Sequence, residues 1–214
     1  MKKVRMFVVA CCVCLAMLLT AGTPAFADSL STGDTVRLFD GLGSYPGGAF
    51  KVYENGAYLF DTFCLERDES VSMGGYYQVS IDTVAQLGGV NTNSGDPLDS
   101  KTAYLYYSFR NHTLAGFDYT SEADFTSLQL AIWYLENEIT SLSDSKALAY
   151  IAAATQAGWT DIGRVRVMNL TSRSLTGEVI NKQSMLTLVP EPSILMLLGL
   201  GLVGLAGFAR RKNS

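Results

Sequence analysis

Cys64 is the residue of this chain whose type most directly suggests chemistry. The chain has 4 cysteines, and the other three, Cys11, Cys12 and Cys14, lie in an apolar N-terminal stretch. If that stretch is removed during export, Cys64 is left without an internal disulfide partner. A lone thiol outside the cell is either buried as a small apolar side chain or engaged in some other chemistry. We expect the second.

A cysteine nucleophile with a histidine base is one chemistry to consider. His112 is the only histidine of the chain, and it falls in an Asn-His-Thr turn after an expected helix. The sequence around it lacks the local signature of a cysteine hydrolase. One histidine and one remaining cysteine are also too few for a zinc or iron site. We therefore expect no enzyme activity, no metal and no cofactor.

The first 27 residues have the three parts of a secretory signal peptide. In chain order these are the basic residues Lys2, Lys3 and Arg5, the apolar stretch 6–19, and the small residues Ala25 and Ala27 on either side of Phe26. This pattern predicts cleavage after Ala27, so that the mature, exported protein begins at Asp28.

Residues 190–214 also have three parts. In chain order these are Pro190-Glu191-Pro192, an expected transmembrane helix at 193–209, and the basic tail Arg210, Arg211 and Lys212. The apolar part is near the short end of the roughly 17 to 25 residues that cross a bilayer as a helix. The basic tail would stay in the cytoplasm, which leaves everything before Pro190 outside.

This C-terminal arrangement resembles the PEP-CTERM sorting signal of Gram-negative bacteria, which an exosortase reads. The resemblance implies an inner-membrane-anchored precursor, processing by the exosortase, and a final place at the cell surface or in the extracellular matrix. The alternative is a plain membrane anchor, which would explain the helix and the basic tail but not the Pro-Glu-Pro motif.

Residues 28–189 are long enough to form one globular domain with a sizeable core. They contain ten Lys and Arg against nineteen Asp and Glu, a net charge of about −9. A negative field of this size disfavours nucleic acid and acidic polysaccharides as simple electrostatic partners.

The first half of this domain has the pattern of β-strands. Residues 49–53 and 57–60 are rich in apolar side chains and flank Asn55-Gly56, a pair that accepts the positive φ of a tight hairpin turn. Cys64 therefore lies at or just beyond the end of a hairpin strand. A further strand is expected at 76–81, before a polar loop at 91–100 without the spacing of a calcium loop.

The middle of the domain has the pattern of helices, which we expect at 101–111, from Ser121 onward, and at 143–157. The second begins with a Ser-x-x-Asp capping box at Ser121 and Asp124, and Gly158 ends the third. Apolar residues at spacings of three and four form a stripe along one face of the second helix, with Gln129 at the edge of the stripe. Its members are Phe125, Leu128, Ile132, Leu135 and Ile139.

The chain is expected to return to strands at 163–170 and 182–189. The order of elements predicts an α+β fold, with an antiparallel β-barrel or sandwich and an inserted helical subdomain. The signal peptide and the C-terminal transmembrane helix would flank this domain.

Three short motifs, in this order, resemble those of the thioester domains of bacterial surface adhesins. They are Phe63-Cys64-Leu65, Gln129-Leu130-Ala131-Ile132-Trp133 and Gln183-Ser184-Met185-Leu186. The resemblance implies that Cys64 and Gln183 condense into an internal thioester, supported by Phe63, Gln129 and Trp133. Leu128 and Lys182 stand where a Thr and an apolar residue are usual, and the second difference leaves Gln129 as the alternative acyl donor.

Such a bond needs its two partners held together, because a carboxamide is a poor electrophile and reacts with a thiol only at high effective concentration. An amine from a partner then takes the acyl group and frees Cys64. The reaction occurs once per molecule, which suits adhesion to an amine-bearing surface or polymer. The main alternative is a non-covalent structural or biofilm-matrix protein, in which Cys64 and Trp133 are core residues and Gln183 faces solvent.

Overall fold

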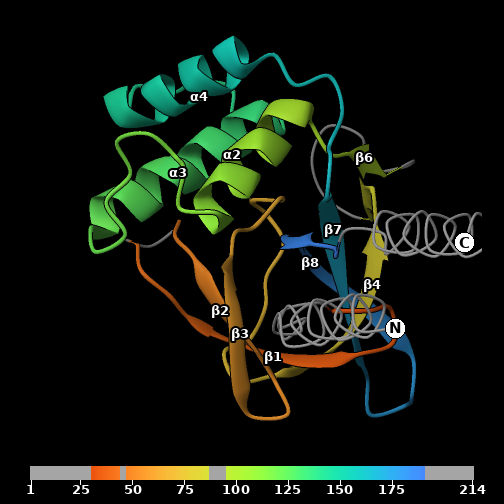
Figure 1. Cartoon of the computed structure of the whole chain (residues 1–214). Coiled ribbons are helices and arrows are strands. Elements are labelled where there is room, and N and C mark those ends of the chain that lie inside the picture. Colours follow the sequence, from red (N-terminus) through yellow and green to blue (C-terminus); the bar gives the residue numbers. More distant parts are fainter. Residues whose placement is uncertain (1–29, 44–46, 87–94, 191–214) are drawn as a thin grey trace, which may run out of the picture.

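The computed structural model describes residues 30–43, 47–86 and 95–190 (Figure 1). The main sheet has six antiparallel strands in the order β3-β2-β1-β4-β7-β8. Their bounds are β1 Thr35–Asp40, β2 Phe50–Glu54, β3 Ala57–Thr62, β4 Tyr76–Asp82, β7 Val165–Arg173 and β8 Val179–Leu188. A small second sheet pairs β5 Val84–Ala85 with β6 Asp96–Pro97.

Three helices come between β6 and β7, and Figure 1 shows them grouped beyond one end of the main sheet. They are α2 Ser100–Arg110, α3 Glu122–Leu135 and α4 Ser145–Ala157. This arrangement confirms the predicted α+β class, with an antiparallel sheet and an inserted helical part.

The hairpin predicted around Asn55-Gly56 joins β2 to β3. Both turn residues have positive φ, 50° for Asn55 and 84° for Gly56, as a turn of two left-handed residues requires. The short sequence signal was therefore enough to predict this part of the sheet.

The helix signals are also confirmed, with two corrections. Ser121 caps α3, and Gly158 ends α4 in the left-handed conformation with φ 66°. The third helix begins at Ser145 rather than Ser143, because Asp144 provides its N-cap. The stripe was wrong at Ile139, which lies beyond the end of α3, because Asn137 adopts φ 62° and stops the helix.

The chain that follows β3 joins the two edges of the main sheet. Thr62 Oγ1 donates a hydrogen bond of 2.6 Å to Leu186 O in β8, and Leu186 N donates one of 3.2 Å to Phe63 O. Cys64 then forms an antiparallel bridge with Met185. The sheet therefore curls until its two edge strands, β3 and β8, meet, and Cys64 lies where they meet.

No helix within residues 30–43, 47–86 and 95–190 combines the length and the apolar character needed to cross a membrane. The predicted signal peptide at 1–27, with Ala25 and Ala27, lies outside the described residues, and so does the predicted transmembrane helix at 193–209.

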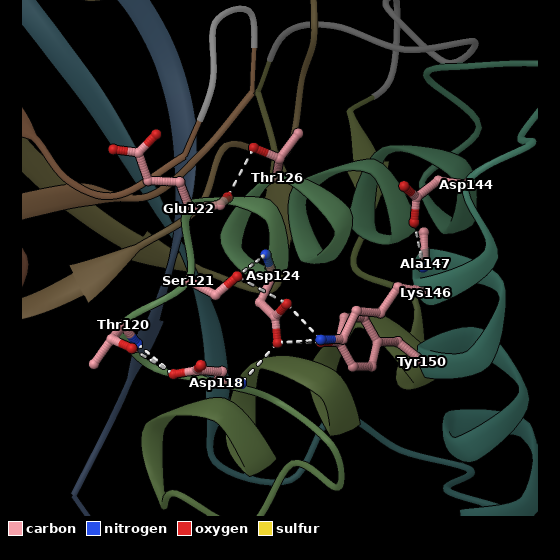
Figure 2. Close-up of polar contacts among 10 residues, drawn as sticks. All are labelled: Asp118, Thr120, Ser121, Glu122, Asp124, Thr126, Asp144, Lys146, Ala147 and Tyr150. Atoms are coloured by element: carbon pink, nitrogen blue, oxygen red, sulfur yellow. Dashed lines mark hydrogen bonds and ion pairs between the residues drawn. The ribbon is translucent and has the colours of Figure 1, made fainter.

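A buried carboxylate ties α3 to α4. Figure 2 shows the Asp124 carboxylate between the Lys146 ammonium and the residues before α3. It accepts hydrogen bonds from Lys146, from Asp118 N at 2.7 Å and from Ser121 Oγ at 3.1 Å. Burial alone would raise the pKa of Asp124, but Lys146 and these donors outweigh it and lower the pKa below its ordinary value. The charged form is therefore the stable one in the folded domain.

We expect Asp124→Ala to lower the free energy of unfolding by about 1–3 kcal/mol, because it removes the ion pair between α3 and the half-exposed Lys146 of α4 and leaves part-buried donors without this acceptor. Urea unfolding at neutral pH measures this loss. Glu122→Ala is the matched control, since Glu122 lies in the same turn but is exposed, and it should cost less than about 1 kcal/mol. Equal losses in the two variants would contradict a role for the Asp124 cluster.

Candidate functional site

Cys64 is buried, with 4% of its surface exposed, and lies between β8 and α3. The β8 side is held by the bridge to Met185 and by Leu65 N, which donates to Ser184 O at 3.0 Å. This pairing brings the first and third motifs of the sequence side by side, although 119 positions separate Cys64 from Gln183 in the numbering.

Gln129 holds Cys64 from the helical side. Its side chain is fully buried in α3, and its Oε1 accepts a hydrogen bond of 3.0 Å from Cys64 N. Its Nε2 donates one of 2.9 Å to Cys64 O. Both ends of the Gln129 amide are therefore engaged by the cysteine backbone, so the side chain positions Cys64 rather than facing its thiol.

Gln183 is the carboxamide that lies beside the thiol. Hydrogen bonding by its side chain to Cys64 lowers the pKa of that thiol, and its Nε2 also donates to Glu66 O at 2.5 Å. The solvent-facing strand position that the non-covalent alternative gave to Gln183 was wrong, because only 4% of its surface is exposed. The cause is the segment after β3, which lies along this part of β8 and covers it: Cys64 bridges Met185, and Glu66 O accepts from the Gln183 side chain.

The Cys64 thiol is neutral at neutral pH. Burial raises its pKa well above the ordinary value, the Glu66 carboxylate raises it further, and only Gln183 opposes them. The thiol therefore lacks the lowered pKa that marks most reactive cysteines. Any reaction here depends on the proximity of the two groups and on a route for the thiol proton.

Glu66 is the functional candidate that sequence reasoning missed. Its side chain is 2% exposed, and its Oε2 accepts a hydrogen bond of 2.8 Å from Ser184 N. Its Oε1 is buried and has no hydrogen-bond partner among the described residues. Burial raises the pKa of Glu66 to about 8 against the opposing hydrogen bonds from Ser184. The sequence offered one hint, a charged residue directly after the apolar Phe63-Cys64-Leu65.

Phe63 packs into the core beside the site, while Trp133 and a glycine lie against the site itself. Phe63 is fully buried, and its ring packs 5.1 Å from the Phe109 ring, centroid to centroid. Trp133 is 3% exposed and belongs to the same apolar cluster as Cys64. Gly47 lies so close that a Cβ there would be 3.1 Å from Gln129 Cγ and 3.3 Å from Trp133 Cζ3. Glycine at this position therefore lets the loop before β2 cover the site.

The remaining predicted residues lie either apart from this site or outside the residues that the structure describes. His112 is exposed after α2, with its ring 4.2 Å from that of Tyr119, and no described contact joins it to Cys64. Pro190 is half-buried and is the last residue described. The other residues of the predicted sorting signal lie outside the described residues: Glu191, Pro192, Arg210, Arg211 and Lys212. Within the described part of the chain, no cluster of His, Cys, Asp and Glu side chains could hold a metal ion.

Comparisons with known proteins bear on the C-terminal motif and on the fold of the domain before it. The PEP-CTERM protein-sorting motif family matches residues 188–212. No curated protein matches the chain significantly. Among solved structures, the fold is similar to the N-terminal thioester domain of a surface protein from Clostridium perfringens, with 13% identity, a TM-score of 0.47, and coverage of 71% of this chain and 97% of that one.

A second similar structure is the N-terminal thioester domain of the fibronectin-binding protein SfbI from Streptococcus pyogenes. It has 13% identity and a TM-score of 0.43, and the match covers 80% of this chain and 98% of that one. The chain thus carries a PEP-CTERM sorting motif at residues 188–212, preceded by a domain that is similar in structure to bacterial surface thioester domains.

Proposed function

We propose that this protein is an exported surface protein that attaches covalently to amines through a Cys64-Gln183 thioester. The observation that carries the proposal is the contact between a buried thiol and a buried carboxamide on two paired segments of chain. Two such groups held side by side gain a high effective concentration, which the slow attack of a thiol on an amide requires.

The proposed reaction is a condensation within the folded domain. Sγ of Cys64 bonds to the side-chain carbonyl carbon of Gln183, the bond from that carbon to Nε2 breaks, and ammonia leaves. Gln129 fixes the cysteine backbone during this step through its two hydrogen bonds. Because the site is dry, the resulting acyl group would be protected from hydrolysis until a partner reaches it.

The partner in this proposal is an amine-bearing surface or polymer. Its amine nitrogen takes the acyl group of Gln183 in an amide bond, and Cys64 returns to a thiol. The domain carries a net charge of about −9 over residues 28–189, so its field attracts cationic amines. One bond forms per molecule, which is binding rather than turnover.

Intact-mass measurement tests this proposal directly. The protein should be lighter than its sequence by one ammonia, and methylamine should convert it to the sequence mass with a methyl group added to one amide. Cys64→Ala should have the full sequence mass and should not react. A full mass in the wild-type protein, with a Cys64 that iodoacetamide modifies freely after unfolding, would instead support the non-covalent structural or matrix protein.

The sorting half of the proposal rests on the motif at residues 188–212. According to this half of the proposal, an exosortase acts on a precursor held in the inner membrane, and the domain then reaches the cell surface or the extracellular matrix. The amine-binding domain lies immediately before this motif in the chain, so both halves belong to one exported product.

Glu191→Ala should leave a larger precursor in the membrane fraction, because it removes the only charge of the Pro-Glu-Pro motif. Immunoblots of fractionated cells that carry the sorting machinery would detect this precursor. Glu178→Ala is the matched control, since Glu178 is exposed at the turn before β8 and should mature normally. Normal maturation of Glu191→Ala would show that the motif is not recognised here.

A further inference from the structure

Glu66 contacts the third motif through both its backbone and its side chain. The backbone oxygen accepts from Gln183 Nε2, the nitrogen that the proposed reaction expels, and Oε2 accepts from the backbone N–H of the next residue, Ser184. The Glu66 backbone therefore contacts the reacting side chain, and the Glu66 carboxylate contacts the backbone of the residue that follows it.

The second carboxyl oxygen is unusual for a structural residue. Oε1 is buried and has no hydrogen-bond partner among the described residues, while the Glu66 carboxylate acts electrostatically on the Cys64 thiol. Burying a polar oxygen without a partner costs free energy. Accepting the Ser184 N–H requires only one oxygen. That contact therefore does not explain why an ionisable carboxyl group, with a second buried oxygen, stands here.

The condensation also needs a proton to move. The Cys64 thiol is neutral in the folded domain and must lose its proton to attack, whereas the amide nitrogen must gain one because an unprotonated amide anion is a very poor leaving group. Both side chains are almost fully buried, with 4% of Cys64 and 4% of Gln183 exposed. A buried group must therefore carry the proton.

We propose that the Glu66 side chain carries the proton from Cys64 Sγ to Gln183 Nε2 during thioester formation, an inference that rests on the proposed function. The carboxylate accepts the thiol proton as Sγ attacks the side-chain carbonyl carbon of Gln183. The resulting carboxylic acid gives that proton to Nε2 as the carbon–nitrogen bond breaks. One ammonia leaves, and Glu66 returns to its carboxylate form.

The same carrier works in the opposite direction when a partner arrives. The attacking amine loses a proton to Glu66 as it bonds to the acyl carbon, and Glu66 gives that proton to Sγ as the thioester opens. Glu66 is consequently unchanged at the end of both reactions, and every atom and charge balances.

Burial, with one neighbouring charge, brings the pKa of Glu66 into the range that this role needs. The titratable groups facing it are the Cys64 thiol and the Glu138 carboxylate, which lies after α3 and accepts from Arg67 N at 2.9 Å. Burial first, and Glu138 in addition, raises the pKa of Glu66 to about 8. A proton carrier is most effective when its pKa lies near the working pH.

The test compares Glu66→Gln with the wild-type full-length chain, each refolded from denaturant in its unmodified form. The rate at which the mass of one ammonia disappears is followed by mass spectrometry at several pH values. We expect the wild-type rate to rise with pH toward about 8. Glu66→Gln keeps an acceptor for Ser184 N but should react roughly a hundredfold more slowly, with the rise moved to more alkaline pH, where only Cys64 titrates.

Two further variants separate a proton carrier from a structural part. Glu138→Gln makes the same chemical change in the neighbouring carboxylate and should keep the wild-type rate within a fewfold. Glu66→Asp retains a carboxyl group and should recover part of the rate and the pH dependence. Thermal unfolding of each variant confirms that it is folded, and if Glu66→Gln does not fold, Glu66→Asp against Glu138→Gln supplies the comparison.

The outcomes distinguish this inference from the function on which it rests. If the wild-type chain loses ammonia, and folded Glu66→Gln loses it at the same rate with the same pH dependence, Glu66 is not the carrier and the thioester stands. If Glu66→Asp has no more activity than Glu66→Gln, the carboxyl group has no special role and the inference is also overturned. If the wild-type chain never loses ammonia, the proposed function fails and this inference fails with it.

Discussion

Replacing Gln183 with Ala is expected to abolish the loss of ammonia completely while the domain stays folded. The variant removes the only carboxamide that contacts the Cys64 thiol in the described structure, so no acyl group remains for the sulfur to attack. Intact mass should equal the sequence mass, and methylamine should have no effect. Because Gln183 is buried and donates to Glu66 O, the variant should also lose about 1–3 kcal/mol of unfolding free energy.

Gln129→Ala is the matched comparison, since it shortens the other buried glutamine of the site. It leaves the backbone N–H and C=O of Cys64 without their partners, so the free energy of unfolding should fall by about 1–3 kcal/mol. Thioester yield should fall but not vanish, because the electrophile is still present. If Gln183→Ala keeps the mass deficit and Gln129→Ala loses it, the two assignments are reversed.

The domain should be more stable at pH 5 than at pH 8. Burial raises the pKa of Glu66 and of Glu136 from the ordinary 4.5 to about 8. Between these values the folded state holds protons that the unfolded state has released, so stability falls as pH rises through this window. At about 1.4 kcal/mol per pKa unit, each carboxyl should account for about 3 kcal/mol between pH 5 and pH 8.

Urea unfolding of the wild-type chain at pH 5, 6.5 and 8 measures this dependence. Of the two carboxyls, Glu136 is the one that does not act on the Cys64 thiol. In Glu136→Gln the free energy of unfolding should therefore depend on pH about half as strongly as in the wild-type chain. Below pH 4 the trend should reverse, because protonation of Asp124 removes the ion pair with Lys146. A stability that rises from pH 5 to pH 8 would show that Glu66 and Glu136 are ionised in the folded domain.

Elements with a local signal were predictable from the sequence. The Asn55-Gly56 turn, the Ser121 cap and the Gly158 terminus each depend on the backbone preference of one or two residues, and each lies where it was expected. Strand β1 was missed, although the buried Val36 and Leu38 alternate with Thr35 and Arg37, because Phe39 interrupts the pattern and six residues give a weak signal beside a glycine-rich loop.

The site was less predictable, because its properties arise from contacts between distant segments. The motifs indicated Cys64, Gln129 and Gln183, but the burial of Gln183 depends on the Cys64–Glu66 segment that lies along β8. The burial of Glu66 likewise depends on Ser184 in the last strand. Strand alternation along either segment carries no information about these contacts.

The place of Gln183 midway along β8 has a mechanical consequence for the proposed attachment. A partner bonded to Gln183 and a force on the chain beyond Pro190 would pull on β8 alone, along residues 183–190. The remaining strands and the three helices would lie outside this load path. Tension would shear β8 from β7, where Leu188 pairs with Val165, yet the partner would stay on the chain even if the whole domain came apart. The attachment would then be as strong as a covalent bond, whatever the stability of the fold.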